Sequence, residues 1–135
     1  MSANESLIEP EVTRATGGTG ELKTILDELN RACKDIQLSM ITTYDGLTMT
    51  SLGSVVDPDQ VGAMCSDLLS LCEKTAQELQ RGEVEQLLLK GKNGGMLILP
   101  AGDKAVLAVM TRPDVNLGMV FLESERAAMS TRAVL

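Results

Sequence analysis

The segment GGMLILPAGDKAVLAVMT, residues 94–111, decides the fold class of this chain. It contains two apolar runs separated by Gly102-Asp103, and a third run, EVEQLLLKGK at 83–92, precedes it across a short glycine-containing turn. Short turns between such runs predict antiparallel strands that are neighbours in one sheet. Because the runs contain few polar residues, we expect at least part of the sheet to be covered on both faces.

A β-hairpin and three helices are predicted around these strands. Residues 36–53 alternate apolar and polar side chains on either side of Asp45-Gly46, a pair that favours a type I′ hairpin turn. Apolar residues at helical spacing predict three helices, and the second begins at Asp57-Pro58, with Gln60 expected to complete a capping box. The helices are expected at 20–34, at 57–81 and from Asp114 or Asn116 onward.

Together these elements predict an α+β domain with the order α-β-β-α-β-β-β-α. A five-stranded antiparallel sheet is expected to lie between the helices. We expect a single domain over residues 19–132, with Thr19 as a candidate N-cap of the first helix. Residues 1–18 lack periodicity and are predicted to form a flexible tail.

The composition excludes several classes of function. The chain has 135 residues and no His, which excludes Ser-His-Asp catalysis, Cys-His catalysis and His-containing metal sites. A net charge of −7, with one Tyr and one Phe, argues against nucleic acid and against anionic membrane surfaces. No apolar stretch is long enough for a membrane span or a secretory signal, and three cysteines without C-x-x-C spacing suggest reduced thiols. We therefore expect a cytoplasmic protein with no cofactor, no bound metal, no nucleic acid and no membrane insertion.

Two glycine-rich segments are candidate anion-binding loops. In TGGTGELKT, residues 16–24, Leu22 stands where the Walker spacing requires glycine, so a tail leading into a helix is the preferred interpretation. KGKNGG, residues 90–95, could bind an anion through its amides and Lys92, but a hairpin turn accounts for its glycines. The turn is the preferred interpretation, and the anion site is the alternative.

Other chemistry-bearing residues are better explained by structural roles. Cys33, Cys65 and Cys72 lie on predicted apolar helix faces, and we expect them to pack as small apolar residues. The carboxylate pair Asp57/Asp59 is assigned to helix capping, and the pair Glu83/Glu85 to solvent, rather than to acid–base catalysis.

The second predicted helix has two faces of different character. Its predicted core stripe consists of Val61, Met64, Cys65, Leu68, Leu71, Cys72, Thr75 and Leu79. On the opposite face small residues recur at a spacing of four, where a solvated helix would carry long charged side chains. Small residues let a second helix approach closely, and a glycine inside a helix costs about 1 kcal/mol relative to alanine unless a contact compensates. We therefore predict a homodimer or partner interface on this face and the following strand, formed by Gly62, Ala63, Ser66, Leu69, Ser70, Glu73, Gln77, Val84, Gln86 and Leu88.

Acidic residues are concentrated in the same region. Residues 57–85 contain seven acidic side chains and two basic ones, Lys74 and Arg81. Such a surface would attract a basic partner surface and repel an acidic one.

Four segments resemble the roadblock / dynein light chain family, whose domain is profilin-like. They are TTYDGLTMTS at 42–51, the helix from Asp57, the strand pair at 94–111, and NLGMVFLESERAA at 116–128. The last is the most specific, because an Asn-Leu-Gly opening onto an apolar helix that bears Glu and Arg is typical of that family. Together the segments cover most of residues 20–128.

The resemblance implies a non-enzymatic dimeric platform of the prokaryotic type, in which the third strands of two protomers pair and the second helices pack together. Within the family, the chain is similar to bacterial gliding-motility proteins that activate GTP hydrolysis. The expected function is a homodimeric adaptor or regulator that binds a small Ras-like GTPase, as an activator or as a scaffold. Arg81 is a candidate arginine finger, although interaction with the helix dipole is the preferred interpretation.

Two other functions stay open from the sequence. One is a purely structural scaffold subunit of a motor-like or sensor-kinase assembly, without effect on nucleotide turnover. The other is a small-molecule sensor or enzyme that uses a cavity between sheet and helices, although no convergent polar cluster points to one.

Overall fold

The structure is a computed structural model, and it describes residues 17–53 and 57–135. It confirms the α+β fold and the predicted order of elements. The elements are α1 (Gly17–Ala32), β1 (Ile36–Thr42), β2 (Thr48–Gly53), α2 (Pro58–Glu78), β3 (Leu87–Gly91), β4 (Gly94–Pro100), β5 (Val106–Thr111) and α3 (Leu117–Val134).

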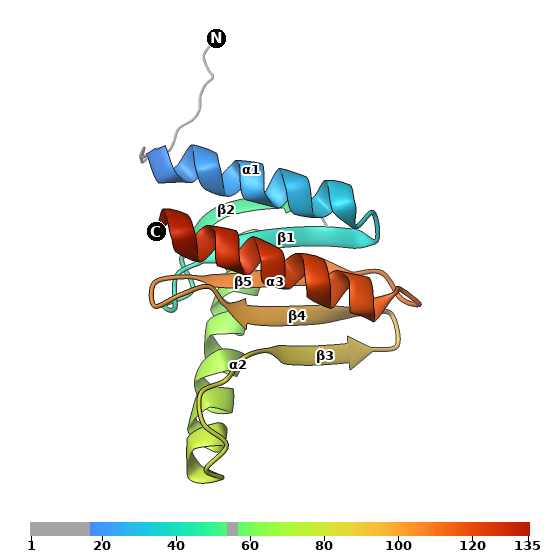
Figure 1. Ribbon diagram of the computed structural model, residues 1–135. Coiled ribbons are helices and arrows are strands. Elements are labelled where there is room, and N and C mark those ends of the chain that lie inside the picture. Colours follow the sequence, from blue (N-terminus) through green and yellow to red (C-terminus); the bar gives the residue numbers. More distant parts are fainter. Residues whose placement is uncertain (1–16, 54–56) are drawn as a thin grey trace.

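The five strands form one antiparallel sheet in the order β2-β1-β5-β4-β3. Helices α1 and α3 lie side by side over one face, and α2 crosses the other face (Figure 1). Each face therefore has its own apolar core. Leu26 and Leu107 belong to the core under α1 and α3, while Met40 and Ile98 belong to the core under α2. The prediction that the sheet is covered on both faces is confirmed.

The β1–β2 hairpin forms as predicted, but its turn differs from the predicted type. The loop consists of residues 44–46, and the Thr43 amide donates across it to the Leu47 carbonyl at 2.9 Å. Only Gly46 in this loop has a positive φ, of 91°. A type I′ turn needs positive φ at both central residues, so the two-residue turn is wrong and a three-residue loop closed by glycine replaces it.

Local capping signals set the starts of the two later helices. The Asp57 carboxylate accepts from the Asp59 amide at 3.1 Å, and the Asn116 side chain accepts from the Met119 amide at 3.2 Å. Both residues therefore act as N-caps. The cap at Asp57 is confirmed as predicted, and Asn116 is one of the two predicted starting points of the last helix. No hydrogen bond from the Gln60 side chain completes a capping box among the described contacts.

Three predicted boundaries are wrong. Helix α1 begins at Gly17 and includes Thr19, so Thr19 is not its N-cap, and residues 1–16 of the predicted tail lie outside the described residues. Helix α2 ends at Glu78, three residues before the predicted end. Strand β3 begins at Leu87, which leaves Val84 and Gln86 in the connection that precedes it.

Candidate partner-binding surface

Helix α2 is rotated relative to the prediction. Its buried residues are Val61, Gly62, Cys65 and Leu69, so Gly62 and Leu69 face the sheet rather than the outside. A Cβ at Gly62 would lie 2.7 Å from the Gly46 carbonyl oxygen, which means that the glycine admits the hairpin loop of its own chain. The prediction that these residues lie on an outer face is wrong.

Ser66, the next small residue along this face, also contacts the hairpin. Its hydroxyl donates to the Tyr44 carbonyl oxygen at 2.6 Å. The spacing of four between Gly62 and Ser66 therefore reflects packing of α2 against the β1–β2 loop. Close approach of backbones does explain the small residues, but the second backbone belongs to the same protomer.

Part of the predicted core stripe of α2 is exposed instead. Met64 is 49% exposed, Leu71 is 64% exposed, and Leu79, at the C-cap, is 62% exposed. Beyond Leu69 no described residue of α2 is buried. The assignment of Met64, Leu71 and Leu79 to the core is wrong.

The length of α2 explains why its second half lacks a cover. The helix has 21 residues, which corresponds to a length of about 30 Å. It runs across the strands, and five strands span only about 20 Å in that direction. The C-terminal half of α2 therefore extends past β3, beyond the edge of the sheet (Figure 1).

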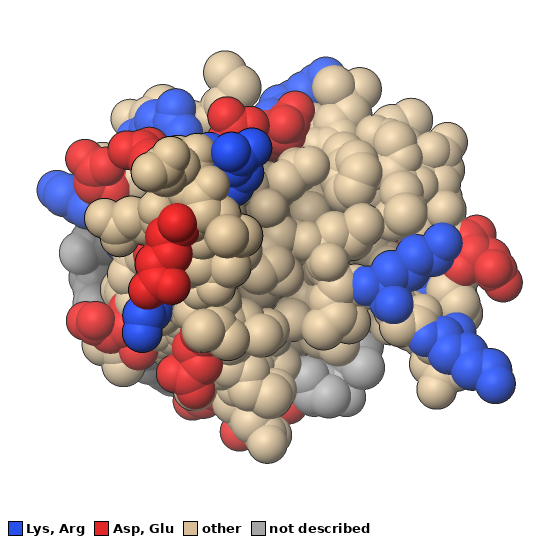
Figure 2. Space-filling model, turned by 90° about the horizontal axis from the view of Figure 1, so that it is seen from below, with Lys and Arg blue, Asp and Glu red and all other residues tan. Residues whose placement is uncertain are grey.

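Strand β3 adds exposed apolar side chains at the same edge. It is the last strand of the sheet and hydrogen-bonds only to β4 among the described strands. Leu88 is 42% exposed and Leu89 is 46% exposed. Seen from below, a broad area without charged side chains crosses the middle of this face (Figure 2). We call the set of Met64, Leu71, Leu79, Leu88 and Leu89 the apolar ridge.

The remaining residues of the predicted interface are distributed around this ridge. Four of them lie exposed on α2, Gln86 is exposed before β3, and Val84 is half-buried and packs against the core under α2. The four on α2 are Ala63, Ser70, Glu73 and Gln77. Comparing the length of the helix with the width of the sheet would have indicated that the second half of α2 is uncovered, and with it Leu71 and Leu79.

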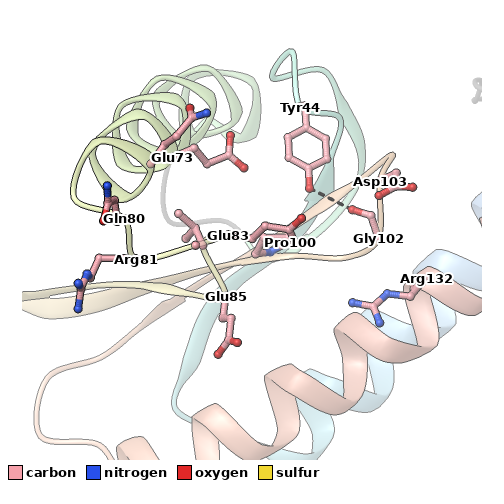
Figure 3. Close-up of a pocket in the computed structure, with 13 residues that line it drawn as sticks. Tyr44, Glu73, Gln80, Arg81, Glu83, Glu85, Pro100, Gly102, Asp103 and Arg132 are labelled. Carbon is pink, nitrogen blue, oxygen red and sulfur yellow. Dashed lines mark hydrogen bonds between the residues drawn. The ribbon is translucent and has the colours of Figure 1, made fainter.

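An acidic cleft opens beside the ridge, between the end of α2, the connection to β3, the β4–β5 turn and the last turn of α3. Its volume is about 1400 Å³. Figure 3 shows Glu73 extending from α2 on the side of Tyr44, with Asp103 beyond the tyrosine ring and Arg132 projecting from α3. Four carboxylates and two guanidinium groups line it, from Glu73, Glu83, Glu85, Asp103, Arg81 and Arg132.

Tyr44 forms one wall of this cleft and fixes its shape. Its hydroxyl donates to the Gly102 carbonyl oxygen at 3.0 Å and so connects the hairpin loop to the β4–β5 turn (Figure 3). Burial raises the pKa of the Tyr44 phenol, and the carboxylates of Glu73, Asp103 and Glu83 raise it further. The neutral phenol therefore persists well into alkaline pH and keeps donating to Gly102.

Residues 21–111 match the family model of the Roadblock/LC7 domain. The chain belongs to the Roadblock/LC7 family. The match covers most of α1 and the whole sheet, and it includes the α2 and β3 residues of the apolar ridge.

The chain is also similar in sequence to an archaeal protein and in fold to two solved structures. An uncharacterized protein of Methanocaldococcus jannaschii, MJ1340, is 38% identical to this roadblock protein over 111 residues, which is 82% of this chain and 96% of the relative. The gliding protein MglB from Thermus thermophilus shares the fold with a TM-score of 0.83 at 16% identity, covering 94% of this chain and 97% of MglB. Profilin II of Acanthamoeba castellanii superposes with a TM-score of 0.58 at 16% identity, over 82% of this chain and 95% of profilin. The fold is therefore profilin-like.

The cysteines of the roadblock domain are placed for packing. Cys33 and Cys65 are buried, as predicted, whereas Cys72 is only half-buried. Burial raises the pKa of the Cys65 thiol to about 11, which removes the thiolate that nucleophilic chemistry requires.

Within residues 17–53 and 57–135, no cluster of three His, Cys, Asp or Glu side chains could hold a metal ion. Among the described helices, none has the length and apolar character needed to cross a membrane.

Proposed function

We propose that this roadblock protein is a homodimeric adaptor that binds and regulates a small Ras-like GTPase. The observation that carries the proposal is the apolar ridge on α2 and β3. Five of the large apolar side chains that are exposed in the protomer lie on these two neighbouring elements. Exposed apolar side chains concentrated at one edge are a feature of interaction surfaces.

In the proposed dimer, β3 of one protomer pairs with β3 of the other, and the two α2 helices pack together. Pairing would satisfy the free edge of β3, which otherwise is a template for aggregation. The overhanging half of α2 would gain the cover that the sheet does not provide. The exposed residues Ala63, Ser70, Glu73 and Gln77, together with Gln86 and Leu88, belong to this proposed interface or its rim.

The acidic cleft supports a basic surface on the GTPase. Its four carboxylates outnumber its two guanidinium groups, and such an imbalance speeds association with a positively charged partner. Regulation would act by ordering the switch loops of the GTPase rather than by supplying a catalytic group. Arg81 lines the cleft, and the backbone carbonyl of Leu79, only two residues away, accepts from its guanidinium at 2.9 Å, which supports the helix-end role over that of an arginine finger.

The mass of the protein in solution tests the dimer. Leu71→Glu places a charge on the ridge and should reduce the mass measured by sedimentation to that of one chain. Leu122→Glu is the matched control, because Leu122 is 54% exposed on α3, away from the ridge. A wild-type protein that stays monomeric at high concentration, or a Leu71→Glu protein with unchanged mass, would contradict the dimer.

Co-purification from the native cell tests the partner. The bound protein is identified, and its GTP hydrolysis is measured with and without the roadblock protein. Faster hydrolysis supports a regulator, and binding without a change in rate leaves a scaffold. Absence of any GTPase from the complex would refute the proposed partner.

A further inference from the structure

Three residues of neighbouring strands form a row on the sheet face that carries α3. Lys90 of β3 pairs with Gly95 of β4, and Gly95 pairs with Thr111 of β5. Two residues along each of β4 and β5, Leu97 and Val109 belong to the core under α1 and α3, so the alternation of a strand puts this row on the same face. Gly95 contributes no side chain to the middle of the row.

A notch of about 250 Å³ lies at this edge of the sheet, and Gly95 is among the residues that line it. The β3–β4 turn and the residues that lead into α3, including Val115 and Leu117, close its sides. Both segments lie at the same end of the molecule (Figure 1). The turn needs Gly94, whose φ is 141°, but Gly95 has no positive φ and its backbone does not require glycine. Turn geometry therefore does not explain the glycine that forms the floor of the notch.

An unsatisfied hydroxyl lies in the wall of this notch. Thr111 is 4% exposed, and its Oγ1 has no hydrogen-bond partner within the part of the chain that the structure describes. The Oγ1 atom lies 3.3 Å from the position that a Cβ on Gly95 would take, so the hydroxyl points across the floor of the notch. Leaving a buried hydroxyl unpaired is unfavourable, and a ligand that accepts from Thr111 would remove that cost.

The charges around the notch are mainly positive, in contrast to the chain as a whole. Lys90, Lys92 and Arg112 line it, together with the carboxylate of Asp114. Arg112 pairs with Asp35 at 3.2 Å, whereas no ion pair among the described residues engages Lys90 or Lys92. At the right-hand end of Figure 2, where the β3–β4 turn lies, Lys and Arg side chains are visible together with acidic side chains.

The start of α3 adds to this positive potential. The helix has no acidic residue in its first turn, and Leu117, its first residue, lines the notch. The N-terminal end of a helix carries a partial positive charge and free amide donors. The ammonium groups, the hydroxyl and the helix end thus all favour a ligand that is negative and accepts hydrogen bonds.

We propose that this notch binds a small oxyanion of the phosphate type, as free phosphate or as the phosphoryl group of a small monoester. Thr111 donates to one anion oxygen, Lys90 provides the charge at the outer side, and the start of α3 faces the anion from above the sheet. Every residue involved belongs to one chain, so the site does not depend on the proposed dimer or on a GTPase.

Titration with inorganic phosphate tests the site on the full chain. Amide resonances in ¹H–¹⁵N spectra are followed at constant ionic strength, with chloride as the balancing anion. We expect saturable shifts at Gly95, Thr111 and Leu117. O-phosphoserine in a parallel titration distinguishes the sources, since tighter binding than phosphate assigns the site to a monoester and equal or weaker binding to the free anion.

Two pairs of variants separate binding from stability. Thr111→Val removes the hydroxyl with little change of shape and should weaken binding about tenfold, the effect of losing one hydrogen bond to a charged group. Ser124→Ala is the matched control, because Ser124 is also buried with an unpaired hydroxyl but lies outside the notch. Lys90→Gln should also weaken binding, whereas Lys104→Gln, at an exposed lysine outside the notch, should not.

Three results would overturn the proposal. The first is the absence of saturable shifts with either phosphate compound. The second is saturation at residues remote from the notch. The third is equal weakening by Thr111→Val and Ser124→Ala in variants whose spectra show a folded chain.

Discussion

Replacing Leu69 and Leu71 separately by alanine tests the orientation of α2. The two leucines are two positions apart on one helix, yet Leu69 is 2% exposed and Leu71 is 64% exposed. Truncating a buried leucine removes its transfer free energy and leaves a cavity, so Leu69→Ala should lower the free energy of unfolding by about 3 kcal/mol. Truncating an exposed leucine in an isolated protomer should change it by less than about 0.5 kcal/mol.

Urea unfolding followed by circular dichroism measures both effects. For a chain of this length the slope of free energy against urea is about 1.5–2 kcal/mol per molar. The expected loss for Leu69→Ala therefore moves the midpoint down by about 1.5–2 M. This shift should be the same at every protein concentration, because the cavity lies inside one protomer.

The concentration dependence separates the two residues further. If Leu71 belongs to the proposed dimer interface, Leu71→Ala should destabilise the protein only at concentrations at which the wild type is dimeric, since dimerisation stabilises by mass action. Equal losses for the two variants at all concentrations would refute the orientation of α2. So would a loss below about 1 kcal/mol for Leu69→Ala.

Three further predictions concern the close approach of α2, the tyrosine and a buried thiol. Gly62→Ala should destabilise the protein by about 1 kcal/mol or more, because overlap with the Gly46 carbonyl outweighs the gain in helix propensity. Gly20→Ala, with open space around it, should instead stabilise, and equal effects in urea unfolding would contradict the packing. Tyr44 is the only tyrosine and the chain has no Trp, so absorbance of the tyrosinate reports on this residue alone. In the native protein the midpoint of its pH titration should lie above 10, and in urea it should return to the ordinary pKa of 10. Because Tyr44 ionises at lower pH in the unfolded chain than in the native protein, the free energy of unfolding should fall as pH rises between the unfolded and native midpoints. A native midpoint at 10 would contradict the burial of Tyr44. Cys65, whose pKa is raised from 9.0 to about 11, should be alkylated about a hundredfold more slowly in the native protein than in urea, because its thiolate fraction falls by that factor. Peptide mass spectrometry that finds equal rates would contradict its buried position.

Local features of the sequence predicted the elements of the fold well. The strand pair at 94–111, the hairpin around Asp45-Gly46 and the cap at Asp57 all follow from side chains close together in the chain. Roadblock membership is also confirmed, by a family match over residues 21–111, although the segment at 116–128 lies outside that match. The predicted turn type is wrong because the loop length is set by the pairing of Thr42 with Thr48 across β1 and β2, and not by the Asp-Gly pair alone.

The orientation of α2 could not be predicted from periodicity. The helix has an apolar arc around Val61 and Leu69 that meets the sheet and a second around Met64 and Leu71 that does not. A periodic pattern shows both arcs but not which one the sheet covers. That choice depends on Gly62, which allows the helix to approach the loop at Gly46, a contact between segments that no local pattern contains.

The overhang of α2 connects this error to the proposed assembly. Helical segments without tertiary packing are marginal in water, because propagation alone contributes little per residue. The helical turns of α2 after Leu69 have no buried residue in the protomer. These turns expose Leu71, and Leu79 is exposed at the C-cap, where an uncovered helix would be expected to carry charged side chains. The edge of β3 presents a second surface without a partner among the described strands, with Leu88 and Leu89 on its two faces. A single interface through α2 and β3 would cover the helix and pair the strand together, whereas an interface elsewhere on the protein would leave both exposed.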